Sequence, residues 1–223
     1  MKRIENTVQD LVTLDHRFYC ELGPGDEGAI STGLRRHDKN VVAVEAPWLE
    51  GHRFEWAEKA AVKMYLMEFF TGDFNQIEEP VDCFILAHSI AHFRFTPYIL
   101  FKKIYDRLPV GGKFYLSTVN GGSFERVYEL FRGIPITGRV SQETAPKYVE
   151  GAKYFNKTDM HQIWDDWMHV KEYTKGELEE IFVNTGFKIH KSYYRNNFFH
   201  WKRNLVTGMF PNLSEEIIVI GEK

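Results

Sequence analysis

Short apolar runs alternate with longer mixed segments along the first 120 residues. Apolar and β-branched runs bounded by turn residues predict buried strands, and they occur here at 18–22, 41–44, 63–70, 81–87 and 113–119. The segments between them are predicted as helices, at 28–36, 51–62 and 97–108. Nearly unbroken apolar strands joined by helices are typical of a parallel sheet covered on both faces. The expected fold class is therefore α/β.

The second half of the chain has a different pattern. Residues 120–170 are irregular and rich in Gly, Pro and aromatic side chains, and they predict a cap over an acceptor site. Regular structure resumes at Thr174, which forms a capping box with Glu177 and predicts a helix to about Asn184. Strands are predicted at 187–194 and 217–220, and the segment 195–213 between them is predicted to be largely loop. We expect one domain, residues 1–223, with the cap as an insertion.

Composition narrows the class of protein. The chain has 223 residues, 43% of them hydrophobic, and a formal net charge of −3, which indicates a globular domain without the basic field that attracts nucleic acid or anionic lipid. Cys20 and Cys83 are expected to be buried free thiols. The N-terminal segment is interrupted by acidic residues and is not a signal peptide. No apolar run approaches the roughly 20 residues that cross a bilayer, so we expect a cytoplasmic protein without a membrane partner.

The most informative motif is a glycine loop between the first strand and the first helix. Gly23, Gly25 and Gly28 form G-x-G-x-x-G, in which glycines permit a sharp turn and a close approach of a ligand to the backbone. Glu45 ends the second strand, where a carboxylate can accept both hydroxyls of a ribose. Asp73 follows the third strand, where a second carboxylate can reach an adenine amino group. A nicotinamide-dependent dehydrogenase is the competing interpretation of this pattern.

Taken together, these motifs resemble those of class I S-adenosylmethionine-dependent methyltransferases. The resemblance rests on Glu-Leu-Gly-Pro-Gly at 21–25, the Glu45 strand end, Gly-Asp at 72–73, the strand ending at His88, and Leu-Pro-Val-Gly-Gly-Lys-Phe at 108–114. It implies a Rossmann-like sheet of seven mostly parallel strands, the last one antiparallel, and S-adenosylmethionine as cofactor with S-adenosylhomocysteine as product. A helix ending at Arg132-Gly133 is similar to family members that methylate sugars and other small metabolites.

The resemblance also implies roles for individual residues. Those that would contact the cofactor are Glu21, Gly23 and Gly25 at the methionine part, Glu45 at the ribose with Ala46 next to it, Asp73 and Phe74 at the adenine, and Ala87 and His88, which would face the cofactor and the incoming acceptor. One departure concerns the third glycine. The family pattern has it where this chain has Glu27, and here it follows one residue later, so we expect the loop to bulge or Glu27 to point to solvent. Some 17 residues precede the first strand, which predicts a more open site or another covering element.

Three histidines are candidates for a general base. His88 and His92 follow the fourth strand, beyond the carboxyl ends where open α/β sheets bind ligands, and histidine is the natural base near pH 7. His169 shares a predicted helix face with His161 and Asp165, a triplet that equally suits a solvated surface. The pair His88/His92 lacks a third ligand at a recognised spacing, so no metal site is predicted.

The expected function is methyl transfer to a small-molecule acceptor, with hydroxyl or sugar acceptors favoured. Three alternatives remain open: a non-catalytic cofactor-binding regulatory subunit, methylation of a protein or nucleic acid, and the dehydrogenase. The sequence does not decide between a monomer and a homodimer. Aromatic residues make up 15% of the chain, and many lie after residue 119, which predicts an aromatic acceptor pocket or lid.

Overall fold

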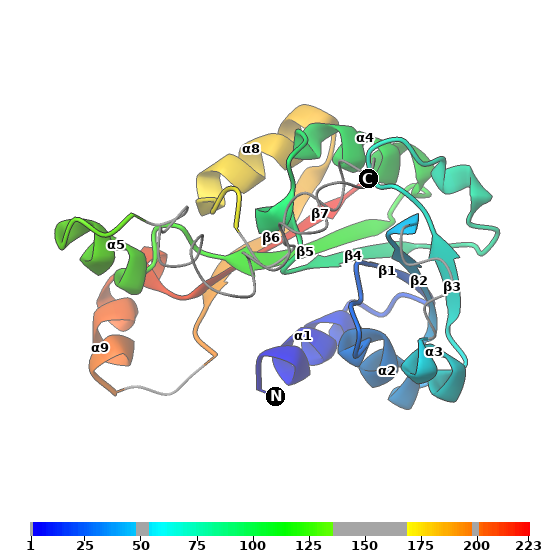
Figure 1. Ribbon diagram of the computed structural model, residues 1–223, viewed down its shortest axis with the longest axis horizontal. Coiled ribbons are helices and arrows are strands. Elements are labelled where there is room, and N and C mark those ends of the chain that lie inside the picture. Colours follow the sequence, from blue (N-terminus) through cyan, green and yellow to red (C-terminus); the bar gives the residue numbers. More distant parts are fainter. Residues whose placement is uncertain (1, 48–53, 136–168, 198–200) are drawn as a thin grey trace, which may run out of the picture.

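The computed structural model describes residues 2–47, 54–135, 169–197 and 201–223, which form a seven-stranded sheet with helices on both faces (Figure 1). The strand order is β3-β2-β1-β4-β5-β7-β6. The strands are β1 (Phe18–Leu22), β2 (Asn40–Glu45), β3 (Lys63–Leu66), β4 (Cys83–Ala87), β5 (Lys113–Val119), β6 (Lys188–Arg195) and β7 (Glu216–Glu222). Strands β1 to β5 pair in parallel, and β7 pairs antiparallel with both β5 and β6. This confirms the predicted fold class.

The helices divide between the two faces of the sheet. On one face lie α1 (Lys2–Thr13), α2 (Ala29–Arg36) and α3 (Glu55–Ala60), and on the other lie α4 (Pro97–Arg107) and α8 (Lys175–Thr185) (Figure 1). Two further helices, α5 (Phe124–Phe131) and α9 (Trp201–Met209), lie together beyond one end of the sheet (Figure 1). None of the described helices is both long and apolar enough to span a bilayer.

Alternation along the strands produces two cores. In β1, Tyr19 packs toward α1 and α2, whereas Cys20 and Leu22 belong to the cluster under α4 and α8, as the two-residue period of a strand dictates. The cluster under α4 and α8 is rich in aromatic rings, and in it the ring centroids of Phe114 and Phe182 lie 5.1 Å apart. Some of the many aromatic residues therefore pack in the core. The sequence pattern predicted an aromatic acceptor pocket or lid and did not predict this packing.

Three local predictions were wrong. The segment 195–213 is not mainly loop, because it contains α9 and a 3-10 turn at Pro211–Leu213. Gly208 lies in the last turn of α9, and Pro211 begins the 3-10 turn. Strand β3 ends at Leu66, before the predicted Phe70. The helix α1 precedes β1 and was not predicted.

Other predictions were confirmed. The capping box of α8 is present, with Thr174 and Glu177 each bonded to the other's backbone. Helix α5 ends at Phe131, next to the predicted Arg132-Gly133. Cys20 and Cys83 are buried free thiols. The proposed cap, residues 120–170, lies mostly outside the described residues.

Candidate functional site

The glycine loop joins β1 to α2 at the carboxyl end of the sheet. Gly23, Gly25 and Gly28 all have positive φ, at 71°, 65° and 49°, a region that side chains disfavour. A Cβ at Gly23 would lie 3.0 Å from Ser89 Oγ, whereas one at Gly25 would meet no atom within 4 Å. The loop therefore turns tightly against β4 at its start and opens outward at Gly25.

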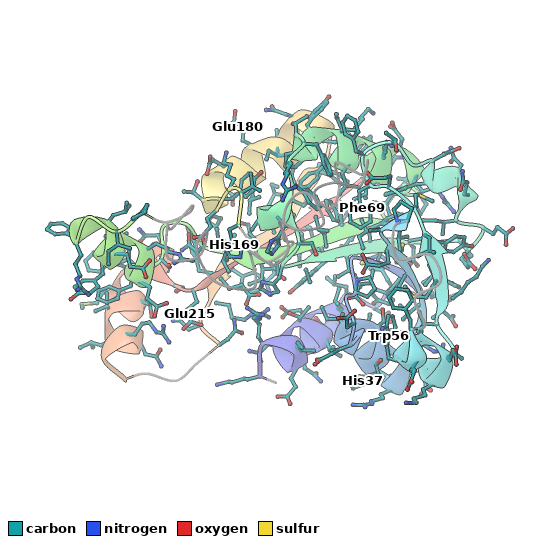
Figure 2. The ribbon with its side chains drawn as sticks, in the orientation of Figure 1. His37, Trp56, Phe69, His169, Glu180 and Glu215 are labelled. Atoms are coloured by element: carbon teal, nitrogen blue, oxygen red, sulfur yellow. The ribbon has the colours of Figure 1, made fainter. Side chains whose placement is uncertain are left out.

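The displaced third glycine has a packing reason. Gly28 is the left-handed N-cap of α2, and a Cβ there would lie 2.2 Å from the indole ring of Trp56. Trp56 belongs to α3, and Figure 2 shows it where α2 and α3 meet. Glu27 is exposed, which is one of the two outcomes expected from the sequence.

Glu45 links the end of β2 to the glycine loop. Its Oε2 accepts a hydrogen bond from the Gly25 N–H at 3.1 Å, and its Oε1 accepts one from the Ala46 N–H at 3.0 Å. Each carboxylate oxygen can accept more than one hydrogen bond. The side chain thus stands beside the exposed part of the loop, as a ribose-binding carboxylate must.

The two residues predicted at the adenine are placed differently from each other. Asp73 is exposed, and its Oδ1 accepts a hydrogen bond from the Asn75 N–H at 2.9 Å. The Phe74 ring is 3% exposed and stacks on Phe84 with centroids 5.9 Å apart. The ring is part of the core beneath the sheet end, and its predicted contact with adenine stays a prediction.

Glu21 is a buried carboxyl directly before the glycine loop. It is 3% exposed, and Ser31 in α2 donates to its Oε2 from both the backbone N–H, at 2.9 Å, and the hydroxyl. Burial raises the pKa of Glu21 to about 7, although these hydrogen bonds favour the ionised form. The group can therefore exist in either protonation state near neutral pH.

Two cavities meet at this end of the sheet. The first has a volume of about 170 Å³ and is lined by α1, the glycine loop and the end of β4, including Glu21, Gly23 and Ala87. The second has a volume of about 370 Å³ and lies between the ends of β5 and β7, α5 and α9. Arg3 and His88 line both cavities. The side chain of His88 therefore stands at the boundary between them.

His88 is held in an unusual conformation by β5 and β7. Its φ is +57°, and its N–H donates to the Ser117 carbonyl at 2.8 Å. Its Nε2 lies 2.8 Å from Glu216 Oε1. The other oxygen of Glu216 accepts hydrogen bonds from Arg195 Nε at 2.8 Å and from Asn197 Nδ2 at 2.7 Å. A non-glycine residue with positive φ is uncommon, and it is a reason to examine a site for function.

The pKa values of His88 and Glu216 determine the charge that each carries at neutral pH. Burial lowers the pKa of His88, and the attraction of Glu216 only partly opposes it. Burial by itself would raise the pKa of Glu216, but His88 and Arg195 hold it at about 2. At neutral pH the pair is thus a neutral imidazole beside a carboxylate. A ring proton on Nε2 would face Glu216 Oε1 and would leave the lone pair on Nδ1.

The other two histidine candidates form a separate cluster. The rings of His92 and His169 lie 4.9 Å apart at 72°, although 77 positions separate them in the sequence. His169 Nδ1 lies 2.7 Å from Glu172 Oε1, and Arg126 binds both oxygens of Glu172. Neither of the two described cavities includes His92 or His169. His161 and Asp165, the predicted companions of His169, lie outside the described residues.

Most of the residues that line the second cavity are polar or charged. Its polar and charged residues, besides Arg3 and His88, are Asn120, Ser123, Glu125, Arg126, Asn197, Arg203, Glu215 and Glu216. Glu215 pairs with Arg203, and Figure 2 labels it near α9. Apolar contacts come from Val119, Phe124 and Leu213. In the part of the chain that the structure describes, no three His, Cys, Asp or Glu residues form a cluster that could hold a metal ion.

Sequence reasoning missed the partners of His88. Glu216 and Arg195 lie in the last two strands, and no local motif marks them. The one available signal was Glu216 itself, an acidic residue next to the apolar run 217–220. An acidic residue at the end of a buried strand requires a partner, because an unpaired buried charge is strongly unfavourable.

Comparisons with known proteins agree with this architecture. No protein-family model and no curated protein matches the sequence. Among solved structures, the chain is similar to a SAM-dependent methyltransferase from Archaeoglobus fulgidus, with a TM-score of 0.62, 10% identity, and coverage of 100% of this chain and 95% of that one. It is also similar to magnesium protoporphyrin IX methyltransferase from Synechocystis, with a TM-score of 0.61, 13% identity, and coverage of 100% and 82%.

A third similar structure is a possible histamine N-methyltransferase from Thermotoga maritima, with a TM-score of 0.59, 16% identity, and coverage of 99% of this chain and 89% of that one. The strand order also supports the similarity to methyltransferases rather than to dinucleotide-binding dehydrogenases. A dinucleotide-binding sheet has the order 3-2-1-4-5-6, whereas here an antiparallel β7 lies between β5 and β6. The chain has the fold of class I S-adenosylmethionine-dependent methyltransferases.

Proposed function

We propose that the protein is an S-adenosylmethionine-dependent methyltransferase that acts on a hydroxyl group of a small polar molecule. One observation carries the proposal: a cavity at the glycine loop adjoins a second, polar cavity, and His88 lines both. A methyl donor and its acceptor require two such adjacent sites, with a base at the boundary.

The residues at the first cavity suit the cofactor. Gly23 and Gly25 leave the backbone bare of Cβ atoms, and a Cβ at Gly23 would crowd Ser89. Glu45 stands beside Gly25 with both carboxylate oxygens directed at backbone N–H groups, so that ribose hydroxyls, which are also donors, suit the same oxygens. Glu21 and Ala87 line the part of the cavity that would hold the methionine group.

S-adenosylmethionine, when bound, supplies a methyl group on a sulfonium, and the acceptor oxygen bonds to that carbon as the carbon–sulfur bond breaks. His88 would take the hydroxyl proton at Nδ1, a buried atom without a hydrogen-bond partner among the described residues, so the ring must become accessible to the acceptor for this step. Glu216 then stabilises the imidazolium that forms. Moving the proton to an adjacent base typically contributes about 10²–10⁴-fold to a rate.

The second cavity supports a hydroxyl-rich acceptor. Glu125, Arg126 and Glu215 place charged groups in its wall, whereas a site for a flat apolar molecule is lined mainly by aromatic and aliphatic side chains. Polar groups placed in this way bind hydroxyl and amide groups by direct hydrogen bonds. We therefore favour sugars and other polyhydroxylated molecules as acceptors.

Calorimetry with S-adenosylmethionine and S-adenosylhomocysteine tests the cofactor assignment. Both should bind, and Glu45→Ala should weaken binding by about 1–3 kcal/mol, because the ribose hydroxyls lose their acceptor. Glu55→Ala is the matched control, since Glu55 pairs with Lys59 on the exposed side of α3, and it should leave the affinity unchanged. Binding of a nicotinamide cofactor in place of both ligands would overturn the proposal.

Transfer itself requires a second assay. A panel of sugars and polyols incubated with methyl-labelled cofactor should yield a labelled product that depends on His88. Tight cofactor binding without transfer to any member of a broad panel of alcohols, amines, proteins and nucleic acids would instead favour a regulatory subunit of the same fold.

A further inference from the structure

A row of alternating charges connects the N-terminal helix to His88. Asp10 in α1 lies 2.6 Å from Arg195 Nη1, Arg195 Nε lies 2.8 Å from Glu216 Oε2, and Glu216 Oε1 lies 2.8 Å from His88 Nε2. We name Asp10, Arg195, Glu216 and His88 the charge chain. Its members come from α1, β6, β7 and the loop after β4, and 185 positions separate Asp10 from Arg195.

The charge chain is built into the fold rather than formed by mobile surface side chains. The side chains of Glu216 and Arg195 are 2% and 11% exposed. Asp10 is held by more than Arg195, because Tyr193 and Tyr115 donate hydrogen bonds to its Oδ2 at 2.5 and 3.1 Å. Groups fixed and shielded in this way interact more strongly than surface ion pairs do.

We propose that Asp10, Arg195 and Glu216 are positioning residues for His88, and that helix α1 thereby helps to set the protonation of the catalytic base. The assignment of His88 as base rests on the proposed function, whereas the electrostatic coupling rests on the contacts alone. Glu216 attracts a proton to His88, Arg195 weakens that attraction by neutralising Glu216, and Asp10 in turn compensates Arg195. The sign of each effect follows from the alternation of charge.

The other charged groups that face His88 are few. Arg3 of α1 lines both cavities with it and opposes its protonation, as Arg195 does. Glu21 and Glu27 line the first cavity, and Glu125, Arg126 and Glu215 line the second. Arg203 binds Glu215, so that these two charges largely cancel near His88. The charge chain contains the single carboxylate at ion-pair distance from His88 among the described residues.

The test is the titration of His88 observed by NMR through its imidazole carbon. The chain has nine histidines, and the His88 signal is identified by its absence from His88→Gln. Glu216→Gln should lower the pKa of His88 by about one unit or more, the usual effect of losing an opposite charge in contact. Arg195→Gln should raise it. Asp10→Asn should lower it by less, because this charge is farther away.

Controls separate coupling from loss of structure. Glu172→Gln removes another buried carboxylate that is held by an arginine and a histidine, and it should leave the His88 titration unchanged. Arg195→Lys keeps the positive charge and should largely restore the titration that Arg195→Gln changes. Asp10, with 26% of its side chain exposed, offers a variant that is expected to fold even where Arg195→Gln does not.

The signs of the shifts decide the outcome. Opposite shifts for Glu216→Gln and Arg195→Gln, or for Asp10→Asn and Arg195→Gln, support the charge chain. Equal signs, or an unchanged His88 signal in folded Asp10→Asn and Glu216→Gln, would overturn it. The titration needs neither cofactor nor acceptor. A protein that fails to bind S-adenosylmethionine but shows opposite shifts would therefore refute the proposed function and leave the coupling standing.

Discussion

The two sides of the site are built by different means. On the glycine-loop side, the backbone N–H of Gly25 donates to Glu45, which lies at the end of the neighbouring strand. On the β7 side, charged side chains from α1, β6 and β7 meet in pairs around His88. The first side uses local backbone geometry, and the second uses long-range electrostatics. The two sides should therefore respond to mutation in different ways.

The largest contrast is expected in stability. Glu216→Ala leaves the nearly buried Arg195 with Asp10 as its one carboxylate partner among the described residues, and breaking a buried pair typically costs about 3–5 kcal/mol in the free energy of unfolding. Glu45→Ala removes a partly exposed carboxylate that binds two backbone N–H groups, and it should cost about 1 kcal/mol. Urea denaturation of both variants measures the difference. Equal losses would show that the two sides are not built differently.

The sequence predicted the glycine-loop side better than the β7 side, because the first is built from local contacts and the second from long-range ones. The glycine loop, Glu45 and Glu21 lie in or beside strands whose order follows from a simple α/β pattern, so that their meeting could be inferred. Glu216 and Arg195 meet only because β7 runs antiparallel beside β6. Asp10 meets them through a helix that was not predicted. Long-range pairing of this kind leaves no spacing rule in the sequence.

Predictions for single residues also depended on packing. Phe74 was assigned to the adenine by its position, but stacking on Phe84 places its ring in the core. His169 was grouped with residues that lie outside the described part of the chain, and among the described residues its partners are His92 and Glu172. In both cases tertiary contacts that the sequence does not mark determine what the ring packs against.

The second contrast concerns catalysis. His88→Gln should lower kcat by about 100-fold or more, the usual minimum for loss of a general base. His169→Gln is the matched variant, since this histidine also pairs with a buried carboxylate but lines neither cavity. It should lower kcat by less than about tenfold, or 1.4 kcal/mol in activation free energy. Turnover of labelled cofactor with the identified acceptor measures both, and the reverse order would transfer the base to the His169 cluster.

The third contrast lies within the glycine loop. Gly25→Ala and Gly28→Ala both place a side chain at positive φ, which costs about 1–2 kcal/mol. Gly28→Ala also drives its Cβ into the Trp56 ring, and overpacking of this kind adds about 1–3 kcal/mol. Thermal unfolding should therefore rank Gly28→Ala below Gly25→Ala. If Trp56→Ala abolishes this difference, the contact with the indole ring is its cause.

The smallest contrast concerns the pH dependence of stability, in which the contributions of Glu21 and Glu216 should change in opposite directions. Glu21 and Glu216 are both nearly inaccessible, at 3% and 1% exposed, yet neutral Ser31 donors face the first and cationic partners face the second. The pKa of Glu21 is raised to about 7, so its contribution to stability is present below about pH 4.5 and is lost as the pH rises toward 7. The pKa of Glu216 is lowered to about 2, so its contribution is present above about pH 4.5 and is lost as the pH falls toward 2.

Comparison with the glutamine variants isolates each carboxyl group. The difference in unfolding free energy between the wild type and Glu21→Gln should fall as the pH rises from 4.5 to 7, by at most about 1.4 kcal/mol per pH unit. The difference between the wild type and Glu216→Gln should fall as the pH decreases from 4.5 to 2. Titrating groups that do not contact the mutated carboxyl group are common to each pair and cancel in the subtraction, whereas the contribution of His88 to the Glu216→Gln difference is obtained from its NMR titration. Slopes of the same sign would mean that burial, rather than the charge of the partners, determines both pKa values.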